Sequence, residues 1–115
     1  MLFRVAGRRG FAMPLIGLAV AGAFLMRIAD AAEVSVSIQN FTFTPARITV
    51  PAGTSVTWIN NDDIPHVVAD AKNPRAMKSP PLDTGDRFTF VYAKPGTYPY
   101  FCVLHPHMQG TVIVR

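Results

Sequence analysis

Apolar and polar side chains alternate along the stretch VSVSIQNFTFTPARITV, residues 34–50. Alternation with a period of two is typical of strands that are buried on one face only. The stretch therefore predicts half-buried strands at Val34–Ile38, Phe41–Phe43 and Arg47–Val50. A turn at Pro51–Gly53 is predicted to end the third strand, because proline and glycine favour turns.

The rest of the chain continues this strand pattern. Further strands are predicted at Val56–Ile59, His66–Val68, Phe88–Tyr92, Thr97–Cys102 and Thr111–Val114. No helical periodicity follows about residue 31, and seven or eight short strands with frequent turns predict an all-β fold, a Greek-key β-sandwich. The expected core residues are Phe43, Trp58, Phe88, Phe90 and Val112.

One stretch within this pattern is predicted to be a surface loop. The stretch from Asp70 to Pro81 contains three prolines, and proline lacks the N–H donor that a central strand needs. The loop also contains Met77 and three basic residues, Lys72, Arg75 and Lys78. We expect it to be solvated, in preference to forming a patch that docks a partner.

The first 31 residues are predicted to be a signal peptide. A basic start precedes a mostly apolar run, Phe11–Met26, and the small residues of Ala29–Ala31 predict a cleavage site. The segment Arg8–Phe11 also has the Arg-Arg-x-Phe core of a twin-arginine signal, although ordinary secretion is the favoured route. Cleavage is favoured over anchoring, because an apolar run of about 16 residues is shorter than the roughly 20 that span a bilayer. Residues 32–115 are therefore predicted to form one exported, periplasmic or secreted domain.

Most of the formal net charge of +4 belongs to this predicted leader. Four of the 11 Lys and Arg residues lie before Ala32, where the only acidic residue is Asp30. Seven basic and six acidic residues remain from Ala32 onward. A domain so close to neutral lacks the basic stripe that binds nucleic-acid phosphates, which excludes nucleic acid as a partner.

Cys102 is the sole cysteine, so an internal disulfide is impossible. By itself it is compatible with a buried apolar residue, an intermolecular disulfide or a metal ligand. Its neighbours favour the metal ligand, because His105 and Met108 follow within six residues. His66 comes after the loop that closes the Trp58 strand, and a Greek-key fold can bring that loop to the same end as Cys102. One thiolate, two imidazoles and a thioether are the donors of a blue-copper site.

At these positions the chain resembles the cupredoxin family, most closely its amicyanin and plastocyanin-like branch. The shared segments are Phe43-x-Pro45, Ile48-x-Val50, Pro51-x-Gly53, Val56-x-Trp58-x-Asn60, Pro65-His66, Gly96-Thr97-Tyr98 and Gly110-x-Val112, together with the ligand loop. The Cys-x2-His-x2-Met spacing of residues 102–108 is similar to the short ligand loop of amicyanin, whereas plastocyanins have a longer gap between His and Met. The resemblance implies a cupredoxin-like β-sandwich that binds one type 1 copper ion.

The resemblance also implies which residues bind the copper. The equatorial ligands would be His66, Cys102 and His105, and the axial ligand would be Met108. The family usually has Asn or Ser directly after the first histidine, where the side chain ties the two ligand loops together, but this chain has Val67. Loop rigidity and redox potential are therefore less predictable from the family.

The predicted function is outer-sphere transfer of single electrons by a monomer. Electrons would pass through the edge of His105, inside an apolar rim of Pro65, Leu104 and Pro106. The expected partners are a redox-protein donor and acceptor, such as a dehydrogenase, a cytochrome or an oxidase. No general base, nucleophile or substrate pocket is evident, so we predict neither an enzyme nor a small-molecule substrate.

Other functions stay open from the sequence. A copper carrier or storage protein is the main alternative, and His107 beside Met108 is its only indication. His107 is expected to be a surface residue in preference to a metal ligand. A small copper enzyme with an open coordination site is a further alternative. A structural zinc site is disfavoured, because a thioether is a poor zinc ligand.

Overall fold

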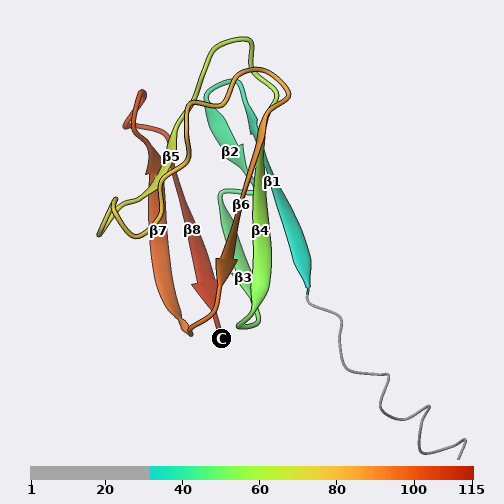
Figure 1. The fold of residues 1–115 in the computed structure, drawn as a ribbon, viewed down its shortest axis with the longest axis vertical. Helices are drawn as coiled ribbons and strands as arrows, with labels where there is room; N and C mark the ends of the chain where they lie inside the picture. Colours follow the sequence, from blue (N-terminus) through green and yellow to red (C-terminus); the bar gives the residue numbers. More distant parts are fainter. Residues whose placement is uncertain (1–31) are drawn as a thin grey trace, which may run out of the picture. The chain divides into compact units, whose positions relative to one another are not determined.

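Eight strands form the part of the chain that the computed structural model describes, residues 32–115 (Figure 1). The strands are β1 (Glu33–Gln39), β2 (Thr42–Thr44), β3 (Arg47–Val50), β4 (Thr54–Asn60), β5 (Val68–Asp70), β6 (Arg87–Tyr92), β7 (Gly96–Cys102) and β8 (Gln109–Val114). They confirm the predicted all-β class. The predicted signal peptide, with its cleavage site and twin-arginine motif, lies outside the described residues. Within residues 32–115, no helix is long and apolar enough to cross a membrane.

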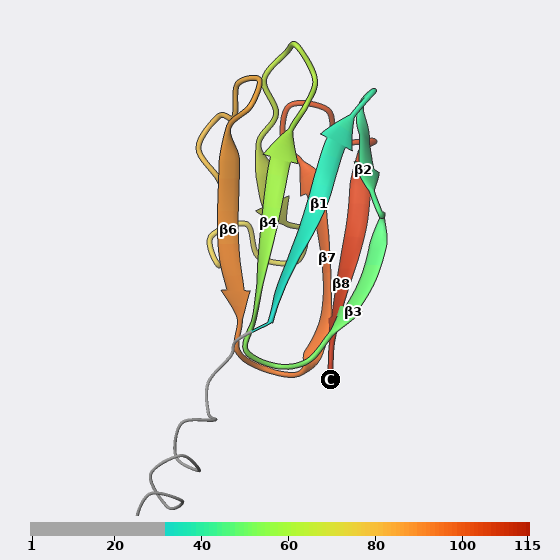
Figure 2. The ribbon, with the colours of Figure 1, turned by 90° about the vertical axis from the view of Figure 1, so that its right-hand side faces the viewer.

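The strands are arranged in two four-stranded sheets that face each other (Figure 2). One sheet has the order β2-β1-β4-β6 and the other has the order β3-β8-β7-β5. The pairs β1–β4 and β3–β8 are parallel, and the other neighbouring strands are antiparallel. The first parallel pair arises because the chain leaves its sheet after β2 and returns to it as β4. The result is the predicted β-sandwich with Greek-key crossovers.

The core lies between the two sheets and follows the alternation of the strands. In β4, every second residue from Thr54 to Asn60 is buried. Phe43, Trp58 and Val112 are buried as predicted. Phe88 and Phe90 of β6, which were also predicted to be core residues, are only partly buried and pack against the core. The reason is that β6 is an edge strand of its sheet.

The loop between β5 and β6 closes one open side of the sandwich. Met77 and Leu82 from this loop belong to the hydrophobic core, and Ser79 is also buried. The prediction of a solvated loop is therefore wrong for Met77, although the three basic residues of the loop are exposed. The correction has a simple reason: a sandwich of two separate sheets leaves apolar side chains uncovered between its edge strands.

Phe41 does not belong to a strand, which corrects the prediction from the alternation. Asn40 and Phe41 form the turn between β1 and β2, with φ angles of 54° and 56°. The left-handed turn lets β2 fold back and pair with β1, and it directs only Phe43 into the core. Phe41 instead is 43% exposed. Asparagine tolerates such a φ angle, but it is unfavourable for Phe41, so this turn needs support from elsewhere in the molecule.

Candidate metal site

The first part of the site is the loop from the end of β7 to the start of β8. Cys102 is the last residue of β7 and is fully buried. Three backbone hydrogen bonds join the candidate ligands of this loop. The N–H of His105 donates to the carbonyl of Cys102, the N–H of Met108 donates to that of His105, and the N–H of Cys102 donates to that of Met108. This closed set of bonds holds Cys102, His105 and Met108 around one tight turn.

The second part of the site is His66, which lies near the end of the loop between β4 and β5. Its backbone N–H donates to the carbonyl of Leu82, and its carbonyl accepts from the N–H of Leu82. The fully buried Asn60 shapes the loop before it. The Asn60 amide donates to the carbonyls of Ile64 and Leu82, and its oxygen accepts from the N–H of Asp62. His66 is thereby held rigidly at the end of the sandwich where β7 ends.

The donor atoms of His66, Cys102 and His105 converge. Each residue offers a ligand atom within 4.8 Å of the other two. The Cys102 Sγ atom is 3.5 Å from Nδ1 of His66 and 3.7 Å from Nδ1 of His105. Bonds of about 2.0 Å to imidazole and about 2.3 Å to thiolate, at a trigonal angle, place nitrogen and sulfur about 3.7 Å apart. The three groups therefore fit a first-row metal ion as they stand.

The donor types select among the possible metals. Thiolate and thioether are soft ligands, and two imidazoles with one thiolate in a trigonal arrangement suit copper. Met108 is buried, and its backbone is hydrogen-bonded to Cys102 and His105 in the same loop. His107 is exposed, with its ring centroid 6.5 Å from that of His105, and is not part of the converging group. The residues present thus fit one copper ion.

Two backbone contacts tie the ligand loops together, whereas the apolar side chain of Val67 cannot form the hydrogen bond of an Asn or Ser. Val68 pairs with Cys102 in the ladder between β5 and β7. The N–H of Val103 donates to the carbonyl of Val67 at 2.8 Å. The β5–β7 ladder therefore supplies part of the rigidity that the family obtains from an Asn or Ser side chain.

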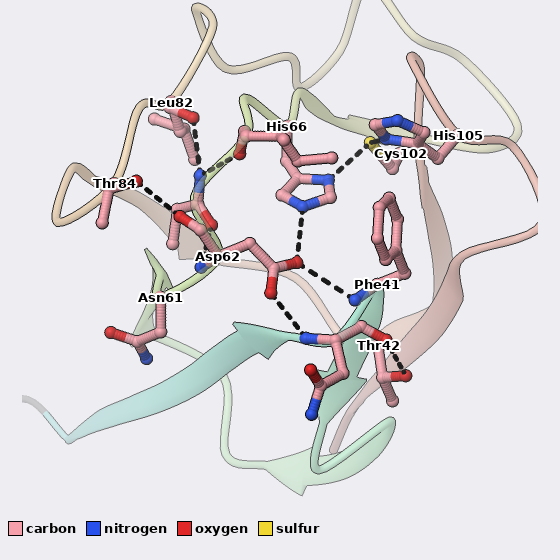
Figure 3. A network of polar contacts seen from close by, with 12 residues as sticks. Phe41, Thr42, Asn61, Asp62, His66, Leu82, Thr84, Cys102 and His105 are labelled. Carbon is pink, nitrogen blue, oxygen red and sulfur yellow. Dashed lines mark hydrogen bonds and ion pairs between the residues drawn. The ribbon is translucent and has the colours of Figure 1, made fainter.

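Asp62 is a residue of this site that the sequence analysis missed (Figure 3). Its Oδ2 atom is 2.8 Å from Nε2 of His66, and its carboxylate also accepts hydrogen bonds from the backbone N–H groups of Asn40 and Phe41. Burial raises the pKa of Asp62, but the hydrogen bonds from Phe41, His66 and Asn40 outweigh burial and leave that pKa below its ordinary value. Asp62 is therefore a carboxylate at neutral pH. In the sequence, the one indication of this role is that Asp62 lies four residues before His66.

Phe41 is the second residue that the sequence analysis missed. Its ring meets His66 and His105 edge to face, with centroid distances of 5.7 and 5.1 Å. Leu104, which precedes His105 in the chain, is 49% exposed, and Pro65 and Pro106 are exposed as well. The predicted apolar rim around His105 is therefore extended by Phe41, and is defined from here on as Phe41, Pro65, Leu104 and Pro106.

Comparisons with known proteins agree with this geometry. Residues 12–114 match the family model of the cupredoxin-like domain. Amicyanin from Paracoccus denitrificans is 34% identical over 91 residues, which cover 76% of this chain and 69% of amicyanin. Chloroplastic plastocyanin from Tetradesmus obliquus is 36% identical over 112 residues, which cover 86% of this chain and 77% of that protein. A solved purple cupredoxin from Nitrosopumilus maritimus has a TM-score of 0.65 and 35% identity, and the match covers 75% of this chain and 100% of the other.

Proposed function

Because this chain belongs to the cupredoxin-like family, we propose that it transfers single electrons through one type 1 copper ion. The proposed ligands are His66, Cys102, His105 and Met108. The observation that carries this proposal is the convergence of two imidazole Nδ1 atoms on the one thiol, at 3.5 and 3.7 Å.

The side chains and backbone of the site prepare it for electron transfer. Bound copper supplies a one-electron couple between Cu(II) and Cu(I). The thiolate of Cys102 cancels one positive charge, which lowers the cost of placing the ion beneath the protein surface. The hydrogen bonds within residues 102–108 and the bonds from His66 to Leu82 fix the donors in advance. Little has to move when the charge changes.

His105 is the proposed route for electrons. It is only half-buried, whereas His66 and Cys102 are fully buried. The apolar rim around His105 offers a small docking surface that can release water when a partner binds. Weak redox encounters bury little area and exchange partners quickly. The proposed partners are a redox-protein donor and acceptor, such as a dehydrogenase, a cytochrome or an oxidase.

The burial of the site favours electron transfer over the alternative functions. A copper carrier or storage protein needs an exposed, exchangeable site, but Cys102 and His66 are 0% exposed. A copper enzyme needs an open coordination position, and the four proposed protein donors would occupy the site. The protein is therefore proposed to be a carrier of electrons and not an enzyme.

The spectrum of protein loaded with Cu(II) tests this proposal. We expect an intense visible thiolate-to-copper absorption and the narrow EPR hyperfine splitting of a type 1 site. Cys102→Ala should lose both features, because it removes the only thiol. His107→Ala is the matched control and should keep both, because His107 lies outside the converging group. Colour that survives in Cys102→Ala, or a colourless wild-type protein, would contradict the proposal.

We propose that the protein is exported, and the sequence of residues 1–31 is the only basis for this proposal. The basic start, the apolar run and Ala29–Ala31 support a cleaved signal peptide that delivers residues 32–115 to the periplasm or the exterior. Mass spectrometry of the purified protein should give Ala32 as the first residue. An intact leader on the exported protein would argue against cleavage.

A further inference from the structure

The carboxylate of Asp62 joins a candidate copper ligand to a turn that lies far away in the sequence. Its Oδ2 atom is 2.8 Å from Nε2 of His66 and 3.0 Å from the backbone nitrogen of Phe41. Its Oδ1 atom is 2.6 Å from the backbone nitrogen of Asn40. The Asp62 side chain is only 10% exposed. These contacts are the dashed lines that meet at the carboxylate of Asp62 in Figure 3.

The contact with His66 determines which of its ring nitrogens can bind a metal. A carboxylate accepts hydrogen bonds, so the proton of a neutral His66 ring lies on Nε2. The lone pair of Nδ1 is then free and lies 3.5 Å from the Cys102 sulfur. A carboxylate in this position also makes the imidazole a stronger donor to a metal.

The contacts with Asn40 and Phe41 stabilise an otherwise unfavourable turn. Both residues have left-handed φ angles, 54° and 56°, and neither is glycine. The two hydrogen bonds to one carboxylate compensate for this conformation. The turn in its present form places the Phe41 ring edge-on to the rings of His66 and His105. Through this turn and the Phe41 ring, Asp62 also affects the position of His105, with which it forms no hydrogen bond of its own.

We propose that Asp62 is a positioning residue of the copper site. It fixes the tautomer and orientation of His66 directly, and through the turn at Asn40 and Phe41 it packs an aromatic ring against both imidazoles. In this way it supplies rigidity that the side chain of Val67 does not. The inference rests on the proposed function, because it concerns the same metal site.

Three variants of the full-length protein test the role of Asp62. Asp62→Ala removes the carboxylate, and Asp62→Asn keeps the shape but has one oxygen acceptor in place of two. Asp62→Glu keeps the charge and is the conservative rescue. Asp63→Asn is the matched control, because it removes the same charge from the neighbouring, exposed position. Thermal unfolding of each variant verifies that it folds.

Two measurements on the metal-free protein do not depend on copper. In ¹⁵N NMR, wild-type His66 should be the Nε2–H tautomer, and Asp62→Ala should give a mixture of both tautomers. Hydrogen exchange of the Asn40 and Phe41 amides should become faster by about tenfold or more in Asp62→Ala. Asp63→Asn should leave both measurements unchanged. An unchanged tautomer and unchanged exchange in Asp62→Ala would overturn the inference.

Two further measurements use the copper-loaded protein. We expect copper affinity to fall by about 10- to 100-fold in Asp62→Ala, which is the usual effect of losing such a partner. We also expect the reduction potential to rise, because a weaker imidazole donor and the loss of a nearby negative charge both disfavour Cu(II). In Asp62→Glu, both the copper affinity and the reduction potential should stay close to their wild-type values. Equal shifts in Asp62→Asn and Asp63→Asn would reduce the effect to charge alone and refute a positioning role. A wild-type protein without the type 1 spectrum would instead refute the proposed function.

Discussion

Gly110 is the residue that makes room for Tyr100 between the sheets. The two residues are paired across β7 and β8, and a Cβ atom at Gly110 would overlap the hydroxyl end of the Tyr100 ring. Tyr100 cannot easily move, because Phe43 and Trp58 hold it edge to face at 4.8 and 5.2 Å. We therefore expect Gly110→Ala to lower the free energy of unfolding by about 1–3 kcal/mol, the usual cost of overpacking. Urea denaturation of the metal-free protein measures this change.

A double-mutant cycle is the control for this prediction. In a Tyr100→Leu background the ring is absent, so Gly110→Ala should cost clearly less than it does in the wild type. Equal costs in both backgrounds would mean that the contact with Tyr100 is not the cause.

The candidate ligands could be named from the sequence, but the contacts that hold them in place could not. Cys102, His105 and Met108 are close in sequence, so their spacing alone indicates a metal site. Asp62 meets Asn40 and Phe41 across 22 and 21 residues. This contact exists only because β1 and β4 pair in parallel and bring the β1–β2 turn beside the β4–β5 loop. Local patterns contain no information on such a pairing.

At the scale of elements, alternation predicted the long strands well and failed where the chain turns. β4 is buried at every second residue, as its pattern indicates. The same alternation misplaced Phe41, because a left-handed turn shifts the phase between β1 and β2. The loop after β5 was predicted correctly as irregular from its prolines. Its buried Met77 and Ser79 were not foreseen, because their burial depends on the gap between two edge strands.

Ser79 is predicted to hold the edge strand β5 in place. Its hydroxyl accepts a hydrogen bond from the N–H of Val68 at 2.9 Å and donates to the carbonyl of Pro80 at 2.8 Å. Ser79→Ala would leave the buried N–H of Val68 without a partner, at a cost of about 1–3 kcal/mol of unfolding free energy. Amide exchange at Val68 should become faster as well. Urea denaturation and hydrogen exchange measure the two effects.

The control for this strand is Ser35→Ala. Ser35 is exposed on β1, so its replacement should change stability by less than about 0.5 kcal/mol. A loss in Ser79→Ala no larger than that would show that water replaces the hydroxyl and that β5 does not depend on it.

At the scale of the whole molecule, two buried phenols should make the sandwich sensitive to alkali. Burial raises the pKa of Tyr100 to about 12, against a smaller opposing effect of the Trp58 indole. Burial, with smaller contributions from Tyr100, Asp70 and Tyr98, raises the pKa of Tyr92 further. In the unfolded chain both phenols have a pKa of about 10. Between about pH 10 and 12 the unfolded chain therefore releases protons that the folded protein keeps.

The sign of the effect follows from this difference in bound protons. The stabilisation is complete below about pH 10, and the free energy of unfolding should fall as the pH rises towards 12, by up to about 1.4 kcal/mol per pH unit for each phenol. Tyr92→Phe should reduce this slope at little cost, because the buried Tyr92 hydroxyl has no hydrogen-bond partner among the described residues. Tyr98→Phe is the control, because the Tyr98 hydroxyl donates to the Lys94 carbonyl near the surface. Urea denaturation of the metal-free protein from pH 9 to 12 measures the slopes. Identical slopes in Tyr92→Phe and the wild type would show that ionisation of this buried phenol does not cause the loss of stability.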